Sequence, residues 1–347
     1  NFSENHLARS VAIWMQQMAG TDRQYKSLGL YSFEENDYSS SWQSVYINGG
    51  LKDLRKIQLL SDQAGKKFSR YKGISQFMEA YLIGMAASIW GDIPYSQAAN
   101  SNFAQPKFDT QKDIHDSMLS LIDSAIINFD KGQIYTLPID FDFTFAADIE
   151  KWKRAAYTLK SRIYLNWAEV ENNNYSLALE AAEDGIMDES GSGDWKALHG
   201  AAISERNVWF QFFLSNPDYM GAGKLLVDML MQKNDDRLGI YFLSTSGSDI
   251  VGVSPGDSIN NASMLNVVGH FGMSWRPEFV SWYENKFIIA ECHYNLGNEQ
   301  LALEILNETL LGIEQKWASS GYVNTSIPRY SNISGEILLE AIMNEKY

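Results

Sequence analysis

Cysteine, proline and basic residues are scarce in this sequence of 347 residues, which has 1 Cys, 7 Pro and 28 Lys and Arg. The single cysteine, Cys292, excludes an intrachain disulfide and a zinc site built from several thiolates. Because Asp and Glu number 43, the formal net charge is −15, which argues against a nucleic-acid-binding protein. The longest apolar stretch, residues 77–90, contains Glu79 and is too short to span a bilayer of about 30 Å.

Familiar signatures of metal and phosphate sites are missing as well. None of the 5 histidines lies four residues from another, the spacing of a zinc-binding helix. Asp218 and Leu225 stand where a phosphate-binding loop needs Gly and Ser or Thr. We therefore expect no catalytic residue, no metal ligand and no cofactor. A glycosidase needs only two suitably spaced carboxylates, so an all-α carbohydrate-active enzyme stays as the alternative.

Apolar residues at three- and four-residue spacing are the dominant pattern, and they predict a mainly α protein. Asp148 has the position and residue type of an N-cap for one of the expected helices. Cys292 falls mid-helix, where we expect a small buried side chain. The expected helices cover residues 6–18, 42–60, 68–90, 113–129, 149–170, 176–187, 224–231, 279–296, 299–317 and 335–347.

A short repeat links two of these helical regions. Residues 177–180 and 301–304 both read L-A-L-E, and each copy follows a longer helix and a polar turn. This is the pattern of a tetratricopeptide unit, so we expect tetratricopeptide-like hairpins over 68–129, 149–187 and 279–317, with loop-rich insertions. Two unrelated amphipathic hairpins are the alternative interpretation.

Aromatic residues are abundant, with 10 Trp and 18 Tyr. The tryptophans at positions 14, 42, 90, 152, 167 and 317 lie in periodic helices, and we assign them to the core. Residues 190–216 and 243–276 break the helical pattern, and loops of such length are usually functional. Aromatic rings in these loops either bind a ligand or cover a small core of the loop itself.

Sugar rings stack on Trp and Tyr, and their hydroxyl groups need polar or charged neighbours. Several loop rings have such neighbours in sequence, for example Arg206 beside Trp209 and Arg276 beside Trp275. The candidate ligand-binding residues are Tyr31, Trp195, Arg206, Trp209, Tyr219, Trp275 and Arg276.

Several motifs resemble those of one known family. Residues 77–98, F-M-E-A-Y-L-I-G-M-A-A-S-I-W-G-D-I-P-Y-S-Q-A, are similar to the helix ending in W-G-D-I/V-P-Y-S-E/Q-A of the SusD/RagB outer-membrane lipoproteins of Bacteroidetes-type bacteria, in particular the SusD-like branch. Residues 148–162 resemble that family's G-D-x-x-K-W…L-x-x-R element, with Ala147 in place of Gly. Residues 16–25, 42–51, 103–111 and 234–238 also fit, so the resemblance covers nearly the whole chain.

The resemblance implies a SusD-like α-α superhelix without enzymatic activity. Such a protein captures an oligosaccharide at the cell surface and covers a SusC-type TonB-dependent transporter in the outer membrane. It implies a lipid anchor on an N-terminal segment that this chain does not contain, and a peptide ligand is the alternative to a glycan. We expect one domain over 1–347, truncated at both ends, with a hairpin core at 66–187 and 276–319. The largely irregular residues 190–275 would face the ligand.

Overall fold

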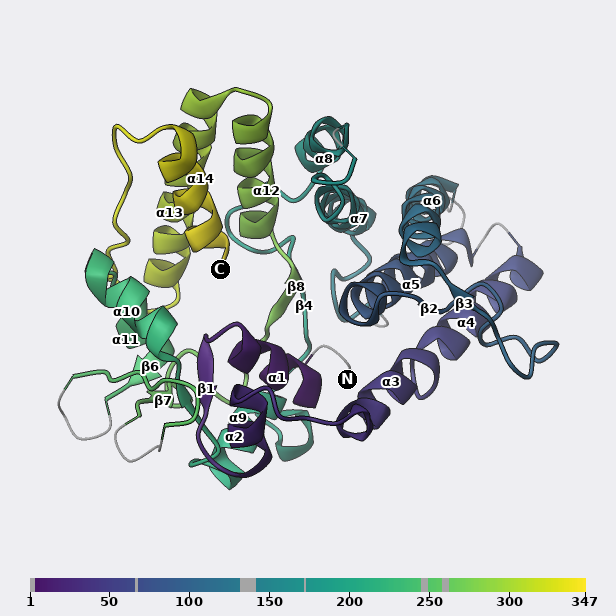
Figure 1. Cartoon of the computed structure of the whole chain (residues 1–347). Coiled ribbons are helices and arrows are strands. Elements are labelled where there is room, and N and C mark those ends of the chain that lie inside the picture. The colour runs from purple at the N-terminus through teal and green to yellow at the C-terminus, as the bar shows by residue number, and fades with distance from the viewer. Residues whose placement is uncertain (1–3, 66–67, 132–141, 172, 245–248, 258–261) are drawn as a thin grey trace. The chain divides into compact units, whose positions relative to one another are not determined.

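The protein is mainly helical, as expected from its periodicity (Figure 1). The computed structural model describes residues 4–65, 68–131, 142–171, 173–244, 249–257 and 262–347. The chain divides into two compact units, each assembled from three separate segments. Unit 1 comprises Asn1–Trp42, Ala197–Pro277 and Glu314–Arg329, and unit 2 comprises Gln43–Lys196, Glu278–Ile313 and Tyr330–Tyr347.

Unit 2 is built from long helices and two short strand pairs. The strand pairs are antiparallel, β2 (Ile93–Pro94) with β3 (Phe108–Asp109) and β4 (Trp195–Lys196) with β8 (Glu278–Val280). Two helices cross the boundary between the units, α3 (Ser39–Tyr46) and α13 (Glu299–Ser319). The others are α4 (Leu51–Ala64), α5 (Ser69–Trp90), α6 (Gln111–Lys131), α7 (Ile149–Leu165), α8 (Asn174–Glu183), α12 (Trp282–Asn295) and α14 (Gly335–Lys346).

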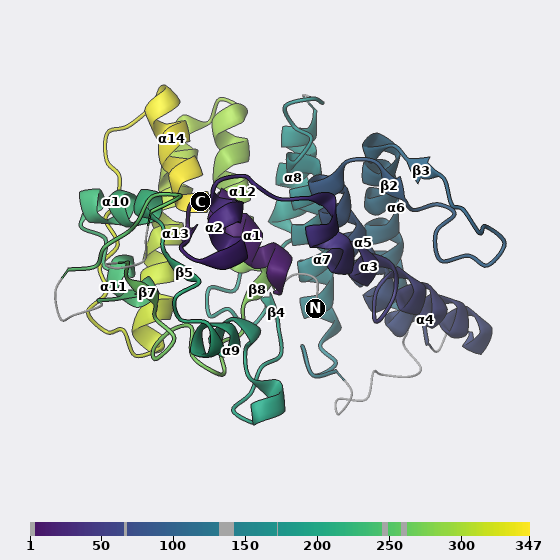
Figure 2. The same ribbon diagram turned by 60° about the horizontal axis from the view of Figure 1, so that its bottom comes forward.

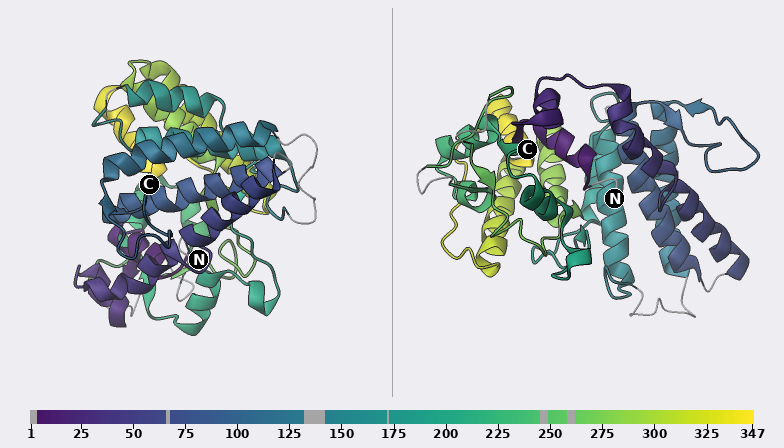
Figure 3. Two further views of the ribbon diagram at one scale, coloured as in Figure 1. Left: turned by 90° about the vertical axis from the view of Figure 1, so that its right-hand side faces the viewer. Right: turned by 90° about the horizontal axis from the view of Figure 1, so that it is seen from below.

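The helices of unit 2 follow one another as the predicted hairpins. Helices α5 and α6 lie side by side, as do α7 and α8 (Figures 2 and 3), and a turn at Gly297 connects α12 to α13. The predicted N-cap is confirmed, because the Asp148 carboxylate accepts hydrogen bonds from the first turn of α7. A Cβ at Gly73 of α5 would lie 2.8 Å from the Phe129 ring of α6, so only glycine permits this close approach.

One predicted helix, over 42–60, is two helices in the structure. Helix α3 ends at Tyr46 and α4 begins at Leu51. Between them Asn48 and Gly49 have φ angles of 56° and 94°, in the left-handed region that interrupts a helix. The apolar spacing continues across this break, which is why the sequence pattern missed it.

Unit 1 has shorter elements and more irregular chain. It contains two antiparallel strand pairs, β1 (Met18–Gly20) with β5 (Met220–Ala222) and β6 (Phe242–Leu243) with β7 (Met264–Leu265). The helices within it are α1 (His6–Trp14), α2 (Arg23–Gly29), η1 (Glu35–Tyr38), η4 (Ile203–Glu205), α9 (Val208–Ser215), α10 (Lys224–Lys233) and α11 (Arg237–Tyr241).

Helix α9 was not expected, because the sequence from 190 to 216 breaks the amphipathic pattern. Its residues V-W-F-Q-F-F-L-S are apolar around most of the helix, so they show no helical periodicity. The start of this helix is marked by its N-cap residue, Asn207, whose side chain accepts hydrogen bonds from Trp209 N and Phe210 N.

A buried polar contact joins three helices of unit 2. Asn285 of α12 is fully buried, and its side-chain amide donates to the carbonyl oxygens of Ala182 and Ile186 at 2.8 and 3.2 Å. Its Oδ1 accepts a hydrogen bond from Thr158 of α7, whose own oxygen accepts one from Ile186 N. The three helices therefore share one closed hydrogen-bond network.

We predict that Asn285→Ala destabilises the protein by about 2 to 4 kcal/mol, because it leaves several buried groups without a partner. The free energy of unfolding from urea titration is the measurement. Asn295→Ala is the matched control, since the exposed Asn295 amide also donates to a backbone carbonyl. Equal stability of the two variants would contradict the assigned role of Asn285.

Candidate functional site

The most specific sequence motif, residues 90–98, is held by buried charges of unit 2. The Glu79 carboxylate, 2% exposed, accepts hydrogen bonds from Arg55, Gln58 and the Tyr95 hydroxyl. Burial, together with Glu79, raises the pKa of Tyr95. Asp109 accepts hydrogen bonds from Tyr95 N and from Ser96 N and Oγ. These groups satisfy one another's hydrogen bonds. They thereby hold in place the residues of the motif, which lie between α5 and α6.

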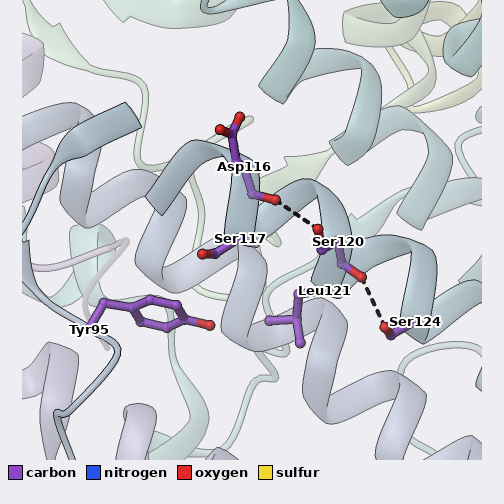
Figure 4. A pocket seen from close by; sticks show the side chains of 6 residues that line it. All are labelled: Tyr95, Asp116, Ser117, Ser120, Leu121 and Ser124. Carbon is purple, nitrogen blue, oxygen red and sulfur yellow. Dashed lines mark hydrogen bonds between the residues drawn. The ribbon is translucent and has the colours of Figure 1, made fainter. Parts of the chain in front are cut away.

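An open pocket of about 420 Å³ lies beside this motif (Figure 4). Its lining residues are Tyr95, Asp116, Ser117, Ser120, Leu121 and Ser124. The Ser120 and Ser124 hydroxyls donate to carbonyl oxygens of the preceding helical turn. None of the candidate ligand-binding residues lines it, and its only carboxylate is Asp116.

Residues 252–256 read G-V-S-P-G and match the G-x-S-x-G pattern of serine hydrolases, a match that the sequence analysis overlooked. That pattern requires a strand, a sharp turn and a helix around the serine. Here Ser254 follows an isolated bridge residue, Val253, and its N–H donates to the Asp257 carboxylate at 3.2 Å. The local structure does not support a nucleophilic role for Ser254.

Metal and thiol chemistry gain no support from the part of the chain that the structure describes. Within it, no group of three or more His, Cys, Asp and Glu side chains could hold a metal ion. Cys292 is buried, as predicted, and burial raises the pKa of its thiol to about 12. A thiol with this pKa is protonated at neutral pH and is a poor nucleophile. The described helices also include none that is long and apolar enough to cross a membrane.

We predict that iodoacetamide does not label Cys292 in the folded protein at pH 8 and labels it fully in urea. The thiol is enclosed by the helices of unit 2 and carries its proton until the pH nears 12. Mass spectrometry of the intact chain provides the measurement. Rapid labelling without denaturant would show that the thiol is accessible.

Two loop segments of unit 1 bring four of the candidate residues into one region. Asn207 is fully buried, and its backbone N–H donates to Met273 O at 2.8 Å. Its side-chain amide donates to Trp275 O at 3.1 Å, while its Oδ1 caps α9. Asn207 thereby connects Arg206 and Trp209 to the segment that carries Trp275 and Arg276.

The two arginines of this region bind the same stretch of backbone. Arg206 Nε donates to Ala201 O at 3.4 Å, and Arg276 Nε donates to His199 O at 3.1 Å. His199 is itself held by Glu4, because its Nε2 lies 2.6 Å from the Glu4 carboxylate. We call this set of Arg206, Trp209, Trp275 and Arg276 the arginine–tryptophan region.

Trp275 also belongs to a cluster of partly exposed rings in unit 1. Its ring centroid lies 4.7 Å from that of Phe271 and 5.7 Å from that of His270. His270 in turn packs edge to face on Trp317 at 4.4 Å. We define the ring cluster as Tyr241, His270, Phe271, Trp275, Trp317 and Tyr322.

Trp317 is the cluster residue that the sequence analysis assigned to the core. Of the six tryptophans assigned to the core, Trp152 is buried, whereas Trp317 is half-buried next to His270 and Tyr322, and those at positions 14, 42, 90 and 167 are half-buried as well. Two exposed apolar side chains flank the cluster residues in sequence. Val268, 82% exposed, comes before His270, and Val323, 72% exposed, follows Tyr322. Periodicity alone could not reveal this, because the neighbouring rings come from another part of the chain.

The remaining candidates lie elsewhere. Trp195 belongs to unit 2, where its half-buried ring packs edge to face on Phe77, Tyr81 and Phe279 at 4.8 to 5.1 Å. Tyr219 is half-buried under the Arg23 guanidinium, beside other rings of unit 1. Tyr31 is 64% exposed. A role in binding remains a prediction for these three residues and for the arginine–tryptophan region.

Comparisons with known proteins agree on one family. A family profile, SusD-like, described as "Starch-binding associating with outer membrane", matches residues 1–347. A SusD/RagB family protein from Bacteroides thetaiotaomicron is 23% identical with a TM-score of 0.78, covering 100% of this chain and 75% of that one.

A chitin-binding SusD homologue from Flavobacterium johnsoniae is 18% identical with a TM-score of 0.79, covering 98% of this chain and 77% of that one. A SusD homologue from Bacteroides vulgatus is 16% identical with a TM-score of 0.73, covering 92% and 67%. At these identities the structural likeness shows the fold alone. No curated protein matches the chain.

Proposed function

The chain belongs to the SusD-like family of proteins described as starch-binding and associating with the outer membrane, and from that premise we propose that it is a non-catalytic receptor for an oligosaccharide. The observation that carries the proposal is the ring cluster of unit 1 beside the arginine–tryptophan region. Rings with one exposed face suit the apolar C–H faces of sugars, and guanidinium groups supply donors for their oxygen atoms.

Trp275 is central to this proposal because it belongs to both sets of residues. Its ring is partly exposed, its carbonyl oxygen is held by Asn207, and Phe271 supports the ring from the side. The backbone and one edge of the ring are therefore held in place before a ligand binds. A ring fixed in advance loses little conformational entropy on binding.

The chemical identity of the sugar is a separate part of the proposal. The family description names starch, and the protein from Flavobacterium johnsoniae is described as chitin-binding. Starch is an α-linked and chitin a β-linked polymer of six-membered sugar rings. The ring faces of either polymer can stack on tryptophan. A peptide ligand and an all-α enzyme are the competing candidates, and the enzyme would need two carboxylates flanking a cleft.

We also propose that the protein works at the cell outer membrane as the partner of a SusC-like TonB-dependent transporter, held there by an N-terminal lipid anchor. The family description, which places its members at the outer membrane, supports this. Genomic context and co-purification of the full-length gene product from membranes are the tests. A reading frame without a secretion signal and without an adjacent transporter gene would contradict it.

We predict that Trp275→Ala weakens glycan binding about 5- to 150-fold, because stacking of a ring on an aromatic side chain contributes about 1 to 3 kcal/mol. A glycan array identifies the ligand and isothermal titration calorimetry measures its affinity. Trp167→Ala is the matched control, since Trp167 is a half-buried tryptophan of unit 2 that packs on His115.

Circular dichroism and thermal unfolding of both variants separate loss of binding from loss of folding. Unchanged affinity in a folded Trp275→Ala variant would contradict the assigned site. Binding of peptides but not glycans by the wild-type protein would favour the competing candidate, and release of shorter sugars from the glycan would favour an enzyme.

A further inference from the structure

Arg206 and Arg276 form no ion pair with the described residues, although the protein is strongly acidic. The chain has 43 acidic and 28 basic residues, so a basic side chain has carboxylates in excess to pair with. Each of these two arginines nevertheless uses only its Nε, for a backbone carbonyl, and neither contacts a described carboxylate. A guanidinium has five N–H donors, so each keeps four for other partners.

The two guanidinium groups lie in the same small part of unit 1. The carbonyls that they bind, those of Ala201 and His199, are two residues apart. Asn207, the neighbour of Arg206, donates to the carbonyl oxygen of Trp275, the neighbour of Arg276. Arg206 is half-buried and Arg276 is exposed, so both can reach a ligand at the surface.

The carboxylates of Glu4 and Glu205 also lie in this place, and neither forms an ion pair with the two arginines. Helix α9 begins directly after Asn207 and has no acidic residue in its first turn, so the positive end of its dipole adds to the same potential. The Glu4 carboxylate lies 2.6 Å from His199 Nε2. The Glu205 carboxylate lies beside Gly200 and forms no ion pair with either arginine.

We propose that the glycan bound at the arginine–tryptophan region is acidic, with carboxylate or sulfate groups held by Arg206 and Arg276 while a sugar ring lies on Trp275. Guanidinium groups bind both kinds of oxyanion through paired N–H donors. The inference rests on the proposed function, since it specifies the class of sugar for the same site. It also gives a reason for two arginines that form no ion pair with the described residues and lie next to a partly exposed tryptophan.

The test uses pairs of glycans that differ only in charge. An array carries oligogalacturonates and their methyl esters, and sulfated carrageenan oligosaccharides and their desulfated forms, beside neutral starch and chitin fragments. Calorimetry at 50 and 300 mM NaCl then measures the wild type, Arg206→Gln, Arg276→Gln and the double variant. Arg154→Gln is the matched control, since the exposed Arg154 also donates to a backbone carbonyl, in unit 2.

We expect at least one anionic glycan to bind about tenfold or more tightly than its neutral form, with an advantage that shrinks at high salt. Each Gln substitution should reduce that advantage about tenfold, and Arg154→Gln should leave it unchanged. The carboxylated and sulfated arms show which oxyanion is preferred.

Two results overturn the inference, and they differ in what they say about the proposed function. Neutral glycans that bind as tightly as their charged forms, or a preference that survives in the double variant, would refute an acidic ligand and leave glycan binding intact. Absence of binding to every glycan on the array would refute both.

Discussion

One buried amide, Asn207, holds together the part of unit 1 on which the functional argument depends. Its Oδ1 caps α9, its Nδ2 donates to Trp275 O, and its backbone N–H donates to Met273 O. A buried asparagine is costly unless its groups are satisfied, and here the contacts also join the start of α9 to the segment of Met273 and Trp275. Arg206 and Trp275 are therefore neighbours because of this residue, although they are far apart in sequence.

Buried polar side chains with satisfied hydrogen bonds also connect the helices of unit 2. Asn285 and Thr158 connect α7, α12 and the end of α8, while Glu79 and Asp109 hold the residues after α5. These polar groups are almost completely buried and mutually bonded, so they specify how the helices meet more than they add net stability. Tight contacts at Gly73 and Gly185 also specify how the helices meet, because a larger residue would push them apart.

The distribution of chemistry over the two units agrees with a binding protein. Glu79, Asp109 and Asn285 of the helical scaffold are buried and hydrogen-bonded, so they are unavailable to a ligand. Arg206 and Arg276, which each use one N–H donor, and the partly exposed ring of Trp275 lie in unit 1. Loops held by a rigid framework commonly carry binding residues, because they can change without cost to the core.

The sequence by itself determined the helical class, the hairpin pattern, the Asp148 cap and the burial of Cys292. All four follow from local spacing or from the character of one residue, and family motifs were recognisable for the same reason. The break at Asn48 and Gly49 and the short helix α9 were missed, since backbone dihedrals and an all-round apolar helix leave no periodic signal.

Only the tertiary structure decided which candidate residues lie together. It joined Arg206 and Trp209 to Trp275 and Arg276, placed Trp195 among the rings of unit 2, and added Trp317 to the ring cluster. Each of these placements depends on contacts between residues distant in the chain. Such contacts arise from the packing of whole segments, and no local pattern of residue types encodes them.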